Sequence, residues 1–317
     1  MKTAAALAMG FTRHASFRDL FPLYDGFILD QFGVMHNGEE SLPGAVEMVQ
    51  TLKDSGKKLA ILSNTSSPSL FALGKLRRFG FDPEHFEGAV TSGEEASKHI
   101  YSNYQGCKAL LLTWNSDSNS IIEQFLKQCG DIELTQDPED ADLVIAHGMH
   151  VIRGNLNDNL KDIPLGGLFL NEDYKVLDPV LKRCAALGLP MINSNPDMVV
   201  VMPGGILAPM PGKISARYEE LGGKCAFFGK PHRPHFEACI EQLGLAKDRV
   251  VHVGDSLHHD IVGANDTGIA SVFVASAGVH AKELGLDLGE LPNDDALIDL
   301  FTRHGITPTH AVPLFRF

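Results

Sequence analysis

Short apolar runs alternate with helical patterns along most of this 317-residue chain, and this alternation limits the fold more than any other feature. The runs that read as strands are 26–29, 59–62, 225–228, 250–253 and 270–274. The helical patterns lie at about 43–56, 70–79, 234–243 and 260–267. Short buried strands separated by helices are typical of βαβ units that share a parallel sheet. The sequence therefore predicts an α/β fold built on a parallel sheet.

The middle of the chain shows the same alternation of apolar runs and helical patterns, which indicates a separate α/β module. Residues 108–112 and 143–146 are apolar runs, 120–128 is helical, and 171–187 looks helical with Asp178-Pro179 inside it. We therefore expect the module to be inserted into the first domain. The expected division is 1–86 for the first part of the core, 87–195 for the inserted domain, and 196–317 for the second part of the core.

Composition narrows the class of protein and of partner. Acidic residues outnumber basic ones by 40 to 27, and the net charge of −13 argues against a nucleic acid as the main partner. The five cysteines are widely spaced, which favours a reducing, cytoplasmic location over a disulfide framework. No apolar run approaches a membrane span, so no membrane partner is expected. The first 18 residues carry basic and no acidic side chains, so import into an organelle stays open as an alternative.

Polar side chains stand where four predicted strands end. Asp30 follows the first strand, Ser63 the second and Lys230 the third, and Asp255 follows the fourth with Asp260 after it. The carboxyl ends of parallel strands meet at one edge of a sheet, where open α/β folds bind their ligands. Paired carboxylates suit a hard cation such as Mg²⁺, and a buried lysine needs an anion such as phosphate. The sequence therefore predicts a site for Mg²⁺ and a small phosphorylated ligand.

Each of these residues also has an ordinary structural interpretation. Asp30 alone reads as a turn residue, Ser63 as a helix N-cap, and Lys230 as a solvated loop side chain. Asp260 alone reads as the cap of the helix that it begins. The functional interpretation depends on all four strand ends meeting at one edge.

The set of motifs resembles that of the haloacid dehalogenase superfamily, whose members are mostly Mg²⁺-dependent phosphatases, and the resemblance covers nearly the whole chain. Gly38 with Pro43-Gly44-Ala45, the segment 91–94 and Asn195-Pro196-Asp197 look like the NagD-type branch, class IIA. That branch carries a large α/β cap, of the C2 type, between its second and third motifs. The resemblance implies a Rossmann-like core with this cap over 87–195. Phosphatases of this branch act on small phosphorylated metabolites, and dimerisation through the cap is common, so a homodimer is one expectation.

The resemblance also implies a role for each residue at the strand ends. Asp30 looks like the nucleophile that takes the phosphoryl group to form an aspartyl-phosphate. Ser63 and the backbone amide of Asn64 would hold the phosphoryl oxygens, and Lys230 would neutralise the phosphate and orient Asp30.

The remaining implied roles concern the metal and the substrate. Asp255 would bind Mg²⁺ directly, together with the carboxylate of Asp30 and the backbone carbonyl of Phe32. Supporting contacts are expected from Asp260 and Ser256. Asp197 would touch the substrate where the chain re-enters the core.

Phe32 is the one serious departure from the family pattern. Phosphatases of the family carry a second aspartate at this position, which acts as general acid and then as general base. Phenylalanine cannot transfer a proton, so a contribution of about 10²–10⁴ in rate is at risk. His36 and His258 are candidate substitutes. A subgroup of class IIA predicted sugar phosphatases has an aromatic residue at this position, and this chain is similar to it.

Three functions stay open at this point. The chain is a phosphatase that tolerates Phe32, or a phosphate-binding regulatory protein without useful turnover, or a hydrolase of carbon–halogen bonds. True dehalogenases carry an aromatic residue at this position but need no metal, so Asp255 and Asp260 speak against the third function. We expect the first.

Overall fold

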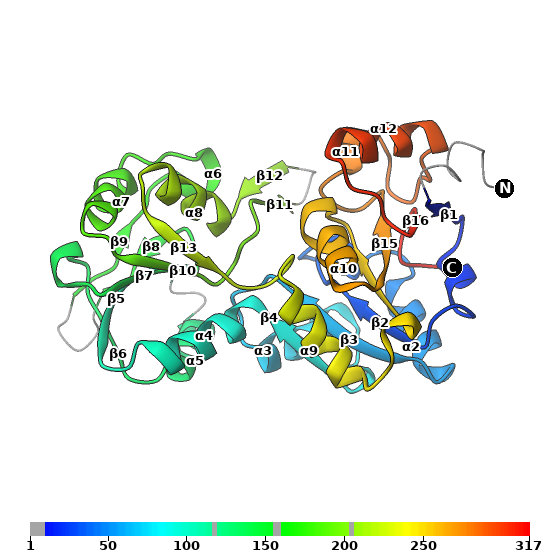
Figure 1. Ribbon diagram of the computed structural model, residues 1–317, viewed down its shortest axis with the longest axis horizontal. Coiled ribbons are helices and arrows are strands. Elements are labelled where there is room, and N and C mark those ends of the chain that lie inside the picture. Colours follow the sequence, from blue (N-terminus) through cyan, green and yellow to red (C-terminus); the bar gives the residue numbers. More distant parts are fainter. Residues whose placement is uncertain (1–9, 116–118, 155–159, 203–205) are drawn as a thin grey trace.

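The computed structural model describes residues 10–115, 119–154, 160–202 and 206–317, which form two lobes along the long axis of the molecule (Figure 1). The first lobe contains the strands near both ends of the described chain, β1 and β16, which pair with each other. Most of the basic N-terminal segment, residues 1–9, lies outside the described residues.

A seven-stranded sheet forms the centre of the first lobe, and every strand pair in it is parallel. In sheet order its strands are β1 (Thr12–Arg13), β16 (His310–Val312), β15 (Ala270–Val274), β14 (Val250–Gly254), β2 (Gly26–Leu29), β3 (Lys58–Ser63) and β4 (Gly88–Thr91). The predicted α/β fold with a parallel sheet is confirmed.

Strand β2 is buried on both faces, as expected of a central strand in a parallel sheet. Successive side chains of a strand point to opposite faces. Phe27 and Leu29 accordingly belong to one apolar cluster with Met48 of α2 (Ala45–Asp54), whereas Ile28 packs in a second cluster with Phe236 of α9 (Arg233–Leu243). Helices on both faces therefore leave the carboxyl end of the sheet as the open edge.

The other helical elements of this lobe are mostly short. They are η1 (Phe17–Leu20), α3 (Ser69–Lys75), η2 (Leu76–Phe79), η3 (Pro83–His85), η7 (Lys247–Arg249), η8 (Leu257–Ile261), α10 (Val262–Thr267), α11 (Ala281–Leu284) and α12 (Asp294–His304). The helix expected at 70–79 is thus an α-helix that tightens into a 3₁₀ turn after Lys75. The helix expected at 260–267 begins only at Val262, because residues 257–261 form a π-helical turn.

The second lobe has its own mixed sheet of seven strands, in the order β13, β10, β7, β5, β8 and β9, with β6 paired to β5. Their bounds are β13 (Lys224–Phe227), β10 (Pro190–Asn193), β7 (Leu143–Ala146), β5 (Cys107–Thr113), β8 (Val151–Ile152), β9 (Ile163–Pro164) and β6 (Ile132–Leu134). The helices are α4 (Ser92–Asn103), α5 (Asn119–Cys129), η5 (Pro138–Asp140), α6 (Leu168–Asn171), α7 (Leu177–Ala186) and α8 (Pro211–Glu220). A hairpin of β11 (Val199–Met202) and β12 (Ile206–Pro209) lies between the lobes in Figure 1.

The structure corrects two expected elements. The helix expected at 171–187 starts only at Leu177, with Pro179 in its first turn, where the missing N–H costs no hydrogen bond. The strand expected at 225–228 exists, but it pairs with β10 in the second sheet and not with the core strands.

These pairings bear on the expected division of the chain, which stays a prediction. Strand β4 ends at Thr91 in the first sheet, and α4 follows at once in the second lobe. We propose that the chain leaves the first unit after Thr91 and returns to it after Phe227, instead of at residues 86 and 195.

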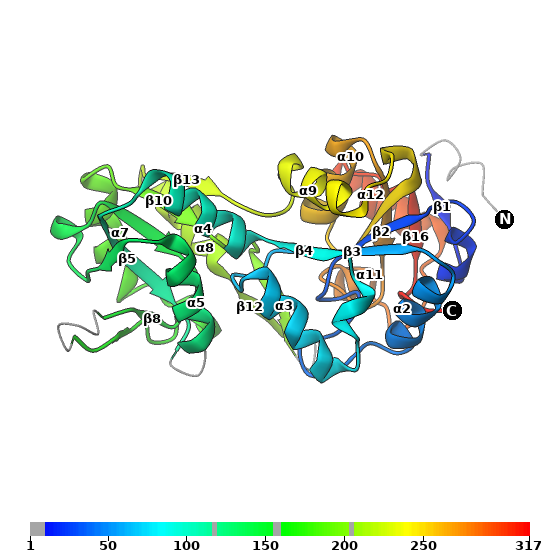
Figure 2. The same cartoon turned by 90° about the horizontal axis from the view of Figure 1, so that it is seen from below.

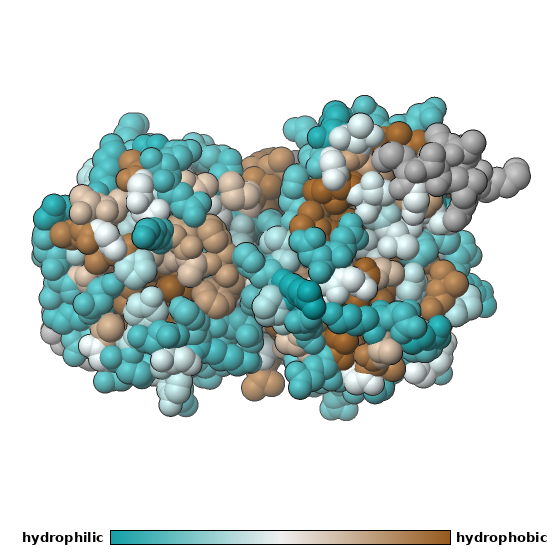
Figure 3. Space-filling view, viewed as in Figure 1, coloured by the Kyte–Doolittle hydropathy of each residue, from teal (hydrophilic) through white to brown (hydrophobic). Residues whose placement is uncertain are grey.

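No helix in the described ranges is both long and apolar enough to cross a membrane. Hydrophilic residues cover most of the rim of both lobes on the face shown in Figure 3.

Candidate active site

Asp30 and Lys230 meet at the open edge of the first sheet. Asp30 directly follows β2, and its Oδ1 lies 2.8 Å from Nζ of Lys230. The same oxygen accepts a hydrogen bond of 2.7 Å from the backbone amide of Gln31. Lys230 is only 2% exposed, so this ammonium has been removed from water and needs its anionic partners. The interpretation of Lys230 as a solvated side chain is therefore wrong.

Asp260 holds the other side of the Lys230 ammonium. Its Oδ1 lies 2.8 Å from Nζ of Lys230 and 2.7 Å from Nε2 of His252, and its Oδ2 accepts the Ser256 amide at 3.0 Å. His252 and Asp260 are both fully buried. Asp260 therefore positions Lys230 beside Asp30 and does not cap the helix that follows it. Sequence analysis missed His252, although a histidine inside a buried apolar strand signals that it has a polar partner.

Asp255 lies beside this pair, because two glycines leave room for its carboxylate. A Cβ on Gly33 would come within 2.7 Å of Oδ2 of Asp255, and one on Gly278 within 2.1 Å. Gly33 also has a φ of 74°, in the left-handed region that glycine adopts without strain. The Val279 amide donates to Oδ2 at 2.9 Å.

Burial and crowding shift the acidities of the three aspartates in different directions. Burial raises the pKa of Asp30 well above its usual value, with repulsion from Asp260 and Asp255 adding to it. Burial and the neighbouring Asp260 raise the pKa of Asp255 to about 7. Burial opposes the ionisation of Asp260 too, but Lys230 and His252 outweigh it and hold the pKa of Asp260 below its usual range.

This carboxylate cluster fits a hard divalent cation. Carboxylate oxygens of Asp30, Asp255 and Asp260 all lie within 4.8 Å of one another. A single ammonium, that of Lys230, cannot balance three buried carboxylates, so the site has excess negative charge. Oxygen donors with excess charge are what Mg²⁺ prefers.

Asn64 connects the loop that contains Lys230 to Asp197 through hydrogen bonds. Asn64 accepts the Lys230 amide through Oδ1 at 2.7 Å and donates through Nδ2 to Asp197 at 2.8 Å. A Cβ on Gly229 would come within 2.3 Å of that Oδ1, so only glycine allows this approach.

All the predicted site residues except Asn64 line one or both of two neighbouring pockets. A pocket of about 340 Å³ is lined by Asp30, Phe32, Asp197, Lys230, Asp255, Ser256 and Asp260. Ser63 lines the other pocket, of about 270 Å³, which shares Phe32, Asp197 and Val200 with the first. Residues 198–201, at and before β11, form one wall of the first pocket, and the two connections between the lobes are seen from below in Figure 2.

His36 and His258, the two candidate substitutes for the proton donor, both contact other aromatic side chains. His36 stacks on Phe79 with 4.1 Å between ring centroids, and burial followed by repulsion from Arg78 and Lys75 lowers its pKa to about 4. It lines the Ser63 pocket and not that of Asp30. His258 lines the Asp30 pocket, but its Nε2 lies 3.0 Å from Nδ1 of His304.

His259, which sequence analysis passed over, faces the Asp30 pocket and has a carboxylate partner. Its Nδ1 lies 3.3 Å from Oδ1 of Asp197, and both side chains line the pocket that contains Asp30 and Phe32. An imidazole oriented by a carboxylate is a common arrangement for proton transfer. The two residues are 62 positions apart, so only the fold brings them together.

Two family models and several curated proteins match this chain. Residues 27–130 match the family model described as haloacid dehalogenase-like hydrolase, and residues 227–299 match the one described as HAD-hydrolase-like. Among curated proteins, the 5'-nucleotidase YutF of Bacillus subtilis is 26% identical over 273 residues, which cover 85% of this chain and 93% of that protein. Human glycerol-3-phosphate phosphatase is 25% identical over 78% of each chain.

Solved structures show the same fold. A haloacid dehalogenase-like hydrolase from Brucella suis superposes with a TM-score of 0.71 at 24% identity, over 94% of this chain and 98% of that one.

Proposed function

Because this chain belongs to the NagD-type branch, class IIA, of the haloacid dehalogenase-like hydrolases, we propose that it is a Mg²⁺-dependent phosphatase of small phosphorylated metabolites. The observation that carries this proposal is the buried Asp30–Lys230–Asp260 chain, with Asp255 beside it, at the open edge of the sheet. A pocket of about 340 Å³ is of a size that suits a small metabolite.

Asp30 is the nucleophile in this proposal. One of its carboxylate oxygens attacks phosphorus, the bond to the leaving oxygen breaks, and an aspartyl-phosphate forms on Asp30. Lys230 holds the carboxylate in place and neutralises the phosphoryl charge, while Ser63 and the Asn64 amide donate to the phosphoryl oxygens. Phosphoryl transfer depends mainly on such positioning and charge stabilisation.

The metal site is assigned to Asp30, Asp255 and the backbone carbonyl of Phe32, with Asp260 and Ser256 as supporting residues. Mg²⁺ bound there supplies positive charge that stabilises the phosphoryl group in the transition state. The chain contributes oxygen donors already held close together by burial and by the glycines at 33 and 278.

His259 takes the proton-transfer role that Phe32 cannot fill. It gives a proton to the leaving oxygen in the first step and takes one from the attacking water in the second, when the aspartyl-phosphate is hydrolysed. Asp197 orients the imidazole at 3.3 Å and is itself held by Asn64. This assignment is supported by the pocket of about 340 Å³, which His259, Asp30 and Phe32 all line.

Asp30→Asn tests the nucleophile directly. The amide retains the size of the side chain but cannot attack phosphorus, so Mg²⁺-dependent turnover should disappear. The assay follows phosphate release from a panel of nucleoside monophosphates, glycerol phosphates and sugar phosphates, with and without Mg²⁺. Asp54→Asn, on the exposed surface of α2, is the matched control and should leave turnover unchanged. Turnover that survives Asp30→Asn would refute the proposal.

A regulatory phosphate-binding protein is the second candidate, and Phe32 is the observation that favours it. In that case Mg²⁺ with a phosphorylated ligand would raise the melting temperature of the wild type, while no member of the panel would be hydrolysed. Halide release without metal would point instead to dehalogenase chemistry.

Homodimer formation is a separate proposal that rests on the NagD-type resemblance. Light scattering coupled to size-exclusion chromatography tests it, with a monomeric mass as the contradicting result.

A further inference from the structure

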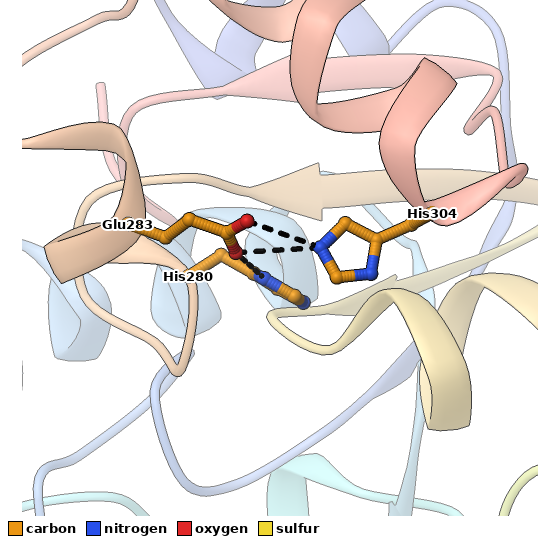
Figure 4. Close-up of side chains that lie close together, drawn as sticks. All are labelled: His280, Glu283 and His304. Atoms are coloured by element: carbon orange, nitrogen blue, oxygen red, sulfur yellow. Dashed lines mark hydrogen bonds and ion pairs between the residues drawn. The ribbon is translucent and has the colours of Figure 1, made fainter.

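A cluster of metal-ligating side chains lies at the rim of the Asp30 pocket and has no part in the proposed phosphatase chemistry. His280 precedes α11, Glu283 lies within it, and His304 ends α12. Figure 4 shows ring nitrogens of both imidazoles facing the oxygens of the Glu283 carboxylate. His280 and Glu283 also line the pocket.

The spacing of the three groups already matches that of ligands around one ion. Nδ1 of His280 lies 3.0 Å from Oε2 of Glu283, and Nε2 of His304 lies 3.3 Å from each carboxylate oxygen. Donor atoms of all three residues lie within 4.8 Å of one another. Ligands bound tetrahedrally to zinc at about 2.0–2.1 Å are separated by roughly 3.3 Å. An ion therefore needs little movement of the chain to enter.

We propose that His280, Glu283 and His304 form a binding site for a borderline divalent cation of the Zn²⁺ class. Two imidazole nitrogens and one carboxylate favour such an ion, whereas the all-oxygen cluster of Asp30, Asp255 and Asp260 favours Mg²⁺. Three protein ligands leave a fourth position for water or another ligand, and two of the three, His280 and Glu283, line the Asp30 pocket.

Two neighbours of the cluster favour binding of an ion, and one hydrogen bond opposes it. Nδ1 of His304 lies 3.0 Å from Nε2 of His258, so His258 fixes the outer nitrogen of a ligand, as partners of metal-bound imidazoles usually do. Arg303 pairs with Oε1 of Glu283, which leaves Oε2 for the ion. Ion binding costs His280 one contact, because its Nε2 accepts a hydrogen bond from the Leu257 amide at 3.4 Å. Binding through Nδ1 places the proton on Nε2, and this long hydrogen bond is lost.

Zinc binding by the full chain tests the site without any substrate. Titration calorimetry and metal analysis are carried out with Mg²⁺ in excess, so that the aspartate cluster is occupied. We expect one Zn²⁺ per chain in the wild type and none in Glu283→Ala or His304→Ala. The exposed Glu283 makes its variant the safer of the two for folding, which circular dichroism checks. His258→Ala, which removes only the outer partner, should weaken Zn²⁺ binding by about 10–100-fold.

His85→Ala, outside the cluster on η3, is the matched control and should bind Zn²⁺ as the wild type does. Failure of the wild type to bind Zn²⁺ would overturn the proposal, as would unchanged binding in Glu283→Ala and His304→Ala. Loss of Zn²⁺ in Asp255→Asn, but not in these two variants, would assign the ion to the aspartate cluster and also overturn it. Because no turnover is measured, the result is independent of the proposed phosphatase activity.

Discussion

The ring of Phe32 occupies the position at which the related phosphatases are expected to carry their proton-transferring aspartate. It packs edge-on against His36, with 5.6 Å between ring centroids, and its Cε2 lies 2.9 Å from where a Cβ on Gly38 would stand. The ring thus lines the Asp30 pocket but offers no proton. At the scale of single residues, the proposed mechanism therefore depends on His259.

Substitutions of His259 and Phe32, made singly and together, test that dependence. His259→Gln should lower kcat by about 10²–10⁴-fold, the usual contribution of a positioned acid or base. Phe32→Asp should raise kcat for esters with poor leaving groups, and in this background the loss of His259 should cost little. Two groups that supply the same proton are not additive in a double-mutant cycle.

Phe32→Asn is the matched control, since it opens the same space without a group that transfers protons. Equal rates for Phe32→Asp and Phe32→Asn in folded protein would mean that proton transfer does not limit the wild type. Full additivity of Phe32→Asp and His259→Gln would separate His259 from the proton-transfer step.

At the scale of elements, helix α2 depends on the glycine that directly precedes it. Gly44 precedes the helix with a φ of 80°, and a Cβ there would come within 2.8 Å of Cβ of Arg316, near the end of the chain. Gly44→Ala therefore combines a left-handed backbone with a steric clash. Gly56, just after the same helix, has a φ of 73° and open space around it.

We expect Gly56→Ala to lower the free energy of unfolding by about 1 kcal/mol, the ordinary cost of a left-handed alanine. Gly44→Ala should cost more, because the backbone or the Arg316 side chain must also move. Urea unfolding of the two variants measures the difference. Equal losses of unfolding free energy in the two variants would show that the Arg316 side chain moves aside without cost and that the clash contributes nothing.

The elements also show where sequence reasoning succeeds and where it stops. The core strands were predictable because Phe27, Ile28 and Leu29 must be buried on both faces, and the polar residues that follow them then meet at one edge. Strand β13 was placed in the wrong sheet, because an apolar run does not reveal which strand it will pair with.

The histidine contacts of the pocket lay beyond the sequence for a related reason. His304 stands 46 residues after His258, and His259 stands 62 residues after Asp197. Partners this far apart in the chain carry no local pattern, so only the packed fold identifies them.

At the scale of the whole molecule, the pocket lies where the two lobes meet, and side chains of both units hold it together. Ser66 of the first unit donates to the carbonyl of His147 in the second at 2.6 Å, and Ser92 of the second unit donates to the carbonyl of Thr65 in the first at 3.1 Å. The chain adds three buried carboxylates to this junction in a molecule of net charge −13. Ionisation of the site should therefore be visible in the stability of the protein.

The contribution of Asp255 to the stability of the ion-free protein should fall as pH rises from about 4 to about 7. Burial raises the pKa of Asp255 to about 7 from its ordinary value of 3.8, so within this window this side chain is more often protonated in the folded state than in the unfolded state. This contribution then decreases with pH, whereas His36, whose pKa burial lowers to about 4, acts in the opposite direction. The raised pKa of Asp30 acts in the same direction as that of Asp255. The lowered pKa of Asp260 gives stability that is lost only in acid, below the ordinary range of an aspartate. Thermal unfolding of the wild type and of Asp255→Asn in EDTA across this pH range isolates this contribution as the difference between the two slopes.

Mg²⁺ should stabilise the protein most at the alkaline end, by about 2.7 kcal/mol at 100 times its dissociation constant. Matched ionic strength with a monovalent salt separates binding from screening. A slope that is the same with and without Mg²⁺ would contradict the assignment of the ion to these aspartates.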